Sequence, residues 1–199
     1  MNKNRCPWCE THFDYQNYHD TEWGVPVFND AKLFETLLLE TFQAGLNWLA
    51  ILRKRENFRT AFDNFDVHKI AGYKANKIDA LCRDSGIVRN RLKIKAAINN
   101  AQAFLRVQES YRSFAQYMWS FVDHKPIQNS YRSLGEVPAK TALSDRISLS
   151  LKNHGFKFVG STIVYAHLQA TGMVNDHLVG CFRYDEVKSL GQKGQEFGS

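Results

Sequence analysis

Apolar residues recur at helical spacing over most of the chain after about residue 30. Residues three and four apart share one face of a helix, so this spacing predicts helices that each bury one stripe. Glycines and prolines separate these segments, and a Ser, Asn or Asp that can cap a helix precedes several of them. We expect helices at about 30–44, 48–62, 67–73, 75–83, 90–110, 114–122, 144–155 and 161–172. Strand-like alternation is scarce, and the predicted fold class is therefore all-α.

The first of these helices carries a carboxylate on its apolar stripe. At 100° per residue, Glu40 falls on the same side as Leu33 and Leu37. Gly45 ends the helix, and a polar cap then places Trp48 in the first turn of the next one. A buried carboxylate without a partner is costly, so Glu40 needs either a partner or a ligand. The residues alone leave open a glutamate that a neighbouring arginine or backbone amides satisfy.

Length and composition indicate one globular domain. The chain has 199 residues, of which 44% are apolar and 23% charged, enough to bury a sizeable core. No apolar run could span a membrane and the first residues lack a signal-peptide pattern, so we expect a cytoplasmic protein. We expect residues 1–184 to form one domain of two helical lobes, with the N- and C-terminal segments packed together. Residues 185–199 contain no expected core residue and are predicted to be a disordered tail or an expression-vector remnant.

The cysteines are candidate metal ligands, because four are too few for a disulfide framework in a chain of this length. His177 and Cys181 are one helical turn apart, a typical spacing for half of a zinc site. The other half has to come from the first 29 residues, which show little periodicity and need an anchor. Cys6 and His19 are available there. Such a site would be closed and structural, and it would join the two ends of the chain.

Other ligand sets remain open from the residues alone. The C-x-x-C pair near the N-terminus offers as a rival set Cys6, Cys9, His177 and Cys181, with His12 as a spare. A free thiol beside an ordinary core histidine is a further alternative. Asn175 or Asp176 could contact the second ring nitrogen of a ligating histidine.

A short turn around Gly86 precedes a helix that begins with four cations, among them Arg89 and Arg91. Cations at a helix N-terminus oppose the helix dipole, and a phosphate bound by the turn's amides would relieve that conflict. The pattern predicts a helix–hairpin–helix that holds a nucleic-acid backbone without reading its sequence. The alternative is an ordinary turn with a solvated basic face. The net charge of +6 is compatible with nucleic-acid binding without establishing it.

Aromatic residues are concentrated before and just after the first predicted helix. A carboxylate surrounded by aromatic faces suits a flat, electron-poor heterocycle. The candidate cavity residues around Glu40 are Trp8, Tyr15, Tyr18, Trp23 and Trp48. The alternative is that these rings pack beneath a loop-rich N-terminal segment and bind nothing.

Several motifs resemble, in the same order, those of the bacterial 3-methyladenine DNA glycosylase I family. They are Tyr18-His19-Asp20, Glu22-Trp23-Gly24-Val25-Pro26, Gln43-Ala44-Gly45-Leu46-Asn47-Trp48, Gly155-Phe156-Lys157-Phe158-Val159-Gly160 and Val174-Asn175-Asp176-His177. The resemblance extends from about residue 5 to about residue 184, nearly the whole chain. It implies a helix–hairpin–helix DNA glycosylase fold in an enzyme of the bacterial cytosol. It further implies one zinc ion held by Cys6, His19, His177 and Cys181.

For the activity, the resemblance implies hydrolysis of the N-glycosidic bond of 3-methyladenine in alkylated double-stranded DNA, by a monomer. Glu40 would be the catalytic residue and would accept hydrogen bonds from the extruded base, which Tyr18 and Trp48 would pack against. Leu46 would fill the vacated base stack, while Gly86, Arg89 and Arg91 would hold phosphates. A non-catalytic DNA- or base-binding module and a zinc-pinned interaction protein are the alternatives. The catalytic aspartate of related helix–hairpin–helix glycosylases has no obvious counterpart in this sequence.

Overall fold

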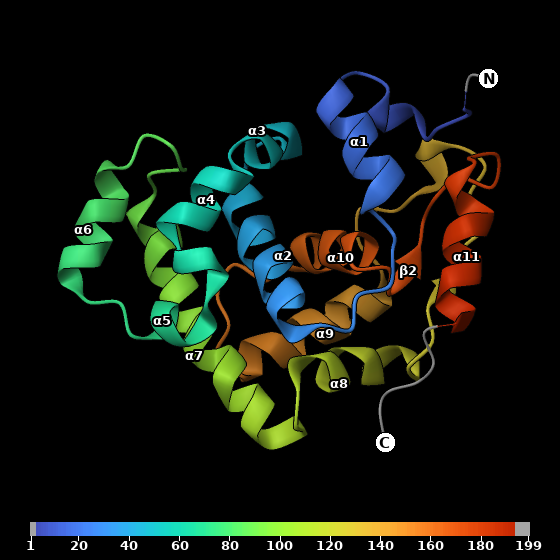
Figure 1. Cartoon of the computed structure of the whole chain (residues 1–199). Helices are drawn as coiled ribbons and strands as arrows, with labels where there is room; N and C mark the ends of the chain where they lie inside the picture. Colours follow the sequence, from blue (N-terminus) through green and yellow to red (C-terminus); the bar gives the residue numbers. More distant parts are fainter. Residues whose placement is uncertain (1–2, 194–199) are drawn as a thin grey trace.

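The computed structural model describes residues 3–193 as a mostly helical protein (Figure 1). The helices are α1 (Phe13–Thr21), α2 (Asp30–Gln43), α3 (Trp48–Arg53), α4 (Arg55–Ala61), α5 (Val67–Ala71), α6 (Ala75–Arg83), α7 (Arg91–Tyr111), α8 (Phe114–Trp119), α9 (Ala142–Asn153), α10 (Ser161–Ala170) and α11 (Arg183–Lys193). Two short parallel strands, β1 (Ile127–Gln128) and β2 (Val174–Asn175), pair with each other. The predicted all-α class is thus confirmed, apart from these four strand residues.

Helix α2 runs through the centre of the molecule, with α4 to α7 on one side and α1, α10 and α11 on the other (Figure 1). It packs against α7 and α10, and its apolar positions are buried, with Leu33 and Phe42 fully inaccessible. The core around it is rich in stacked and edge-packed phenylalanines, such as Phe42 against Phe58. No helix within residues 3–193 has both the length and the apolarity that crossing a membrane would require.

Side-chain caps set the starts of the main helices. The side chain of Asn29 accepts a hydrogen bond from the amide of Lys32 at the start of α2, and Asn47 caps α3 through the amide of Ala50. These caps satisfy amides that have no partner inside the helix. One predicted helix, at 48–62, is divided into α3 and α4 at Lys54. The sharp corner between α2 and α3 was predicted correctly.

Two elements of the structure were missed by the sequence patterns. Helix α1 lies in the segment predicted to lack periodicity, and only Tyr18 and His19 are buried within it. Helix α11 covers residues that the sequence analysis assigned to a disordered tail, which was wrong up to Lys193. In the described part of α11 the buried side chains are Arg183 and Val187, and Val187 alone is apolar, so the sequence shows no apolar stripe there. The rest of the predicted tail, residues 194–199, lies outside the described residues.

The corner between α2 and α3 is braced from α7. The ammonium group of Lys93 donates hydrogen bonds to the carbonyl of Phe42 at 2.8 Å and to that of Ala44 at 2.5 Å. Lys93 is buried, and burial lowers the pKa of its ammonium group. A cation at a helix C-terminus meets the negative end of the helix dipole. One of the four cations expected near the start of α7 therefore holds the α2–α3 corner instead of facing solvent.

Candidate metal site and aromatic cavity

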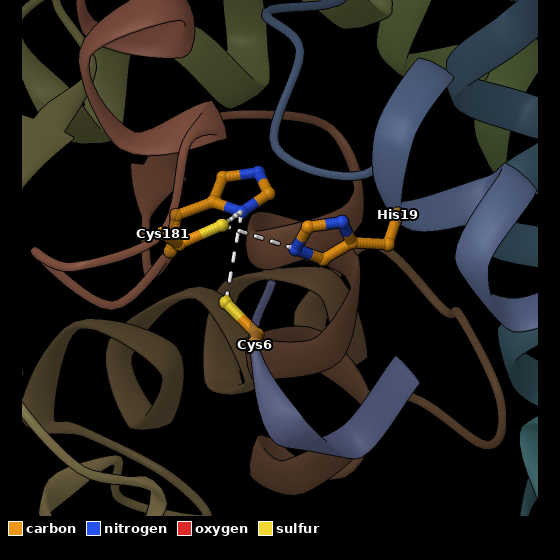
Figure 2. A group of neighbouring side chains, drawn as sticks. Cys6, His19 and Cys181 are labelled. Carbon is orange, nitrogen blue, oxygen red and sulfur yellow. Dashed lines mark hydrogen bonds between the residues drawn. The ribbon is translucent and has the colours of Figure 1, made fainter. Parts of the chain in front are cut away.

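Two cysteines and two histidines from both ends of the chain meet at one point. The ligand atoms of Cys6, His19, His177 and Cys181 all lie within 4.8 Å of one another, and all four residues are buried. The Sγ atom of Cys181 is 3.4 Å from Nε2 of His19 and 3.7 Å from Nδ1 of His177. Ligands of a tetrahedral zinc ion with ordinary bond lengths are about 3.5 Å apart. The group therefore could hold a metal ion, and Figure 2 shows three of its members pointing at a common centre.

The histidine nitrogens outside the cluster have partners that orient the rings. Nδ1 of His19 is 2.8 Å from a carboxylate oxygen of Asp20, which is itself paired with Arg5. Nε2 of His177 is 3.0 Å from the carbonyl of Trp23. Both outer nitrogens can thus donate a proton, which leaves the inner nitrogens free as ligands. The histidine partner expected from Asn175 or Asp176 is in fact supplied by other residues.

The thiol groups of Cys6 and Cys181 interact directly with each other. The hydrogen bond between them raises the pKa of Cys6 and lowers that of Cys181. The rival ligand set is not assembled, because the Sγ atom of Cys9 donates to the carbonyl of Cys6 and lies outside the cluster. His12 caps α1 through the amide of Asp14.

An aromatic cavity of about 240 Å³ lies beside this cluster. Its wall contains all five aromatic residues that the sequence singled out, together with Glu40. The full lining is Trp8, Tyr15, Tyr18, Trp23, Glu40, Gln43, Trp48, Leu134, Val137, Ala166, Gln169 and Asp176. The sequence analysis missed Gln43 and Gln169 as lining residues, because neither stands out by pattern. Asp176 was noted only as a possible histidine partner.

Glu40 faces this cavity without a partner. Its residue is 4% exposed, and no hydrogen bond or ion pair among residues 3–193 includes its carboxyl group. The sequence had left open that an arginine or backbone amides pair with Glu40. Within the described residues, the structure shows no such pairing. Burial raises the pKa of Glu40 to about 8, so the carboxyl group is largely protonated at neutral pH while the cavity is empty.

The rings are held in place from several elements. Tyr18 and Trp48 have ring centroids 5.6 Å apart at an angle of 53°, while Trp8 and Trp23 meet edge to face at 5.1 Å. The hydroxyl of Tyr15 accepts a hydrogen bond of 2.9 Å from the amide at the second residue of α3, which fastens α3 to α1. The indole N–H of Trp48 is buried and has no partner among residues 3–193. The cavity thus combines packed aromatic faces with polar groups that remain free for a ligand.

Two connections between helices, the α6–α7 turn and the α9–α10 turn, differ in the groups that they expose. In the α6–α7 turn, the amide of Gly86 donates to the side chain of Asp84. The side chain of Asn90 accepts hydrogen bonds from the amides of Leu92 and Lys93 at the start of α7. Arg91 is paired with Asp79 at 2.8 Å, whereas Arg89 is exposed. The amides and one of the two arginines predicted to hold phosphates already have partners within the protein.

The α9–α10 turn is more open. Phe158 is 41% exposed and Lys157 is also exposed. The N-terminus of α10 has Gly160 as its cap and no side-chain hydrogen bond. The side chain of Asn100, from α7, donates to the carbonyl of Lys157 and accepts from its amide, which fixes the shape of the turn. This turn was named in the sequence analysis only as one of the motifs that carry the family resemblance. Leu46, on the α2–α3 corner, is 43% exposed and is therefore accessible for the predicted contact with DNA.

Comparison with known proteins supports one family. The methyladenine glycosylase family profile matches residues 8–184. DNA-3-methyladenine glycosylase 1 of Escherichia coli K12 is 47% identical over 180 residues, covering 90% of this chain and 96% of that protein. DNA-3-methyladenine glycosylase of Haemophilus influenzae is 47% identical over 177 residues, covering 89% of this chain and 96% of that protein. A solved 3-methyladenine DNA glycosylase I of Staphylococcus aureus, described for its recognition of 3-methyladenine, has a TM-score of 0.88 at 36% identity and covers 92% of this chain and 98% of its own.

The raised pKa of Glu40 predicts a pH-dependent stability difference. The folded protein keeps the Glu40 proton up to about pH 8, whereas the unfolded chain loses it near the ordinary value for glutamate. The folded state then binds more protons between these values, so this group makes the free energy of unfolding fall as pH rises through that window. Glu40→Gln removes this effect. The difference in free energy of unfolding, variant minus wild type, should therefore increase by more than about 1.4 kcal/mol from the low-pH end of the window to the high-pH end.

The measurement is urea unfolding of both proteins at several pH values across that range. Other titrating groups cancel in the difference between the two proteins. A stability difference that does not change with pH would show that Glu40 is ionised in the folded protein throughout.

Proposed function

The chain belongs to the methyladenine glycosylase family, and we propose that it hydrolyses the N-glycosidic bond of 3-methyladenine in alkylated double-stranded DNA. The products are the free base and an abasic site. The observation that carries the proposal is the cavity whose lining joins five aromatic side chains with a carboxyl group that has no partner among residues 3–193. Family membership makes the chain an N-glycosylase, which argues against the binding module and the interaction protein that the residues had left open.

The chemistry needs little from an acid catalyst. Methylation at N3 gives the adenine base a positive charge, and the bond from N9 to the sugar C1′ is weakened as a result. When that bond breaks, its electron pair moves to N9 and neutralises the base. Water then adds to C1′ and releases a proton to solvent. The protein has to hold the nucleotide outside the helix and stabilise the positive charge that moves from base to sugar.

The cavity residues suit those tasks. Aromatic faces attract a cationic ring, and Tyr18 and Trp48 provide two tilted faces that the base can pack against. Glu40 accepts a hydrogen bond from the amino group of the base. The positive charge of a bound base favours the ionised form of Glu40, against the effect of burial. A negative charge then lies close to the sugar as its own positive charge develops.

Contact with the DNA backbone is assigned to the neighbourhood of the α2–α3 corner. The corner joins the start of α7 through Lys93, and Lys95 of α7 shares a surface hollow with Lys157 and Phe158 of the α9–α10 turn. Leu46 on the corner fills the space that the extruded base leaves. Phosphates bind the open α9–α10 turn, with Lys157 beside the uncapped N-terminus of α10. Arg89 remains a second candidate, whereas Gly86 and Arg91 are less suitable because they already have partners.

Zinc is the metal ion that best suits the two cysteines and two histidines of the cluster. Two thiolates and two imidazole nitrogens are a typical tetrahedral zinc set, and the outer nitrogens of both histidines have the contacts that orient such ligands. Cys6, His19, His177 and Cys181 would hold one ion. With four protein ligands the site is closed, and the ion's contribution is to fix the N-terminal segment to the end of the domain. We propose that the protein acts as a monomer.

The zinc proposal predicts different results for neighbouring residues. His19→Ala and Cys181→Ala should lose the metal and unfold at lower temperature. Cys9→Ser should keep it, because the Cys9 thiol donates its hydrogen bond to a backbone carbonyl and lies outside the cluster. Metal content by elemental analysis and thermal unfolding of the purified proteins give the result. Zinc retained by His19→Ala but lost by Cys9→Ser would point to the rival C-x-x-C set.

Base release tests the activity directly. Wild type incubated with methylated DNA should release 3-methyladenine, which chromatography identifies. Glu40→Gln should fold and bind DNA, yet bind free 3-methyladenine about one to two decades more weakly, because a charge-assisted hydrogen bond contributes roughly 1.5–3 kcal/mol. Its rate of excision should fall as well. Wild type that retains zinc and binds methylated DNA but releases no base would be a binding module.

The DNA-binding assignment predicts a contrast between two cations. Lys157→Ala should weaken DNA binding for all sequences and lower the salt slope by about 1, as expected for a lost phosphate contact. Arg91→Ala is the matched control, since Arg91 is held by Asp79. Affinity for an unmodified duplex is measured at several salt concentrations. A loss confined to Arg91→Ala would restore the α6–α7 turn as the backbone contact.

A further inference from the structure

Asp176 is a second carboxylate in the wall of the aromatic cavity. It follows β2 directly, and its residue is 3% exposed. Its Oδ2 atom accepts hydrogen bonds from the hydroxyl of Tyr165 at 2.6 Å and from Nε2 of Gln169 at 2.8 Å. Its Oδ1 atom accepts one from Nδ2 of Asn129 at 2.6 Å. All three donors are neutral groups.

This carboxylate has no counter-ion in the part of the chain that the structure describes. None of the ion pairs formed among residues 3–193 includes Asp176. A buried charge without a counter-ion is costly, even where hydrogen bonds compensate part of the lost hydration. A carboxylate offers about four acceptor positions, and three of them are filled. A ligand in the cavity can therefore supply what is missing.

Asp176 and Glu40 differ in the hydrogen-bond donors that surround their carboxyl groups. Glu40 forms no hydrogen bond within residues 3–193 and is largely protonated in the empty cavity, with a pKa of about 8. Asp176 instead receives three hydrogen bonds, which stabilise a carboxylate anion. Asp176 is thus the carboxylate of the cavity whose oxygens are held in place by donors, among aromatic faces that also favour a cation.

We propose that Asp176 is the fixed anion that makes the cavity selective for cationic purines over neutral purines of the same shape. The proposal deepens the proposed function and rests on it, since the substrate there is a purine that alkylation has made cationic. Undamaged adenine carries no such charge. Asp176 would thus contribute to discrimination between damaged and normal bases by charge, in addition to any selection by shape.

Asp176→Asn removes the charge with little change in shape. The Oδ1 acceptor for Asn129 is kept. The new amide can donate to Tyr165 after its hydroxyl rotates, or to Gln169 after its side-chain amide turns over. The probes are the 3,9-dimethyladeninium ion, a permanent cation with a methyl group in place of the sugar, and neutral 9-methyladenine. Isothermal titration measures both at a single neutral pH.

Wild type should bind the cation more tightly than the neutral probe. Asp176→Asn should lose at least about tenfold in affinity for the cation, as for a lost charge-assisted contact. Its affinity for 9-methyladenine should change by less than about twofold, because no charged group is lost from that complex. Tyr165→Phe is the control, because it removes one hydrogen bond to the same carboxylate and keeps the charge. It should retain the preference for the cation, and metal content is measured for both variants because His177 follows Asp176.

Equal losses for both probes in Asp176→Asn, or an unchanged preference in a variant that retains its metal, would overturn the proposal. Where that variant does not fold, the wild type still tests the proposal, because equal affinities for the two probes exclude a fixed anion in the cavity. Failure of the proposed function is distinguishable. Wild type that selects the cation yet releases no base from methylated DNA would keep the charge selectivity and lose the glycosylase activity.

Discussion

The aromatic cavity depends on the attachment of the first 25 residues to the end of the chain. Those residues carry four of its rings but form a helix with few buried side chains of its own. The Cys/His cluster supplies the attachment, with ligands before α1, inside α1 and on both sides of the turn that follows β2. Its removal would leave α1 with little to hold it over α2. The cluster therefore serves the cavity indirectly, through the placement of Tyr18 and its neighbours.

Close backbone packing reinforces the same attachment. A Cβ atom on Gly172 would lie 2.5 Å from the backbone of residues 24–26, and one on Gly24 would lie 2.9 Å from Nε2 of His177. Both glycines also have positive φ angles, so any other residue would be strained as well as crowded. On the opposite wall, Lys93 fixes the corner from which Trp48 projects. Each half of the cavity is thus held by contacts between segments far apart in sequence.

The sequence predicted the parts of the site that follow from periodicity or residue chemistry. The stripe on α2 placed Glu40 inside, and the spacing of His177 and Cys181 suggested ligands for a metal. The sequence could not decide between Cys9 and His19, because that choice depends on how the N-terminal segment folds back. It also could not reveal which cations have partners. Asp79 lies in a different helix from Arg91, and Lys93 is buried under a corner whose direction no local pattern fixes.

The role proposed for Asp176 was missed by the sequence analysis for the same reason. Its neighbour His177 belongs to the Cys/His cluster, and proximity in sequence suggested a shared task. Both residues follow β2, however, and their side chains lie in different surroundings. His177 belongs to the cluster while Asp176 lines the cavity, so one short stretch after β2 contributes to both. The Cys/His cluster anchors this stretch, and through it the position of a carboxyl group in the cavity. A change at the cluster would consequently alter the electrostatics of the cavity as well as the packing of its rings.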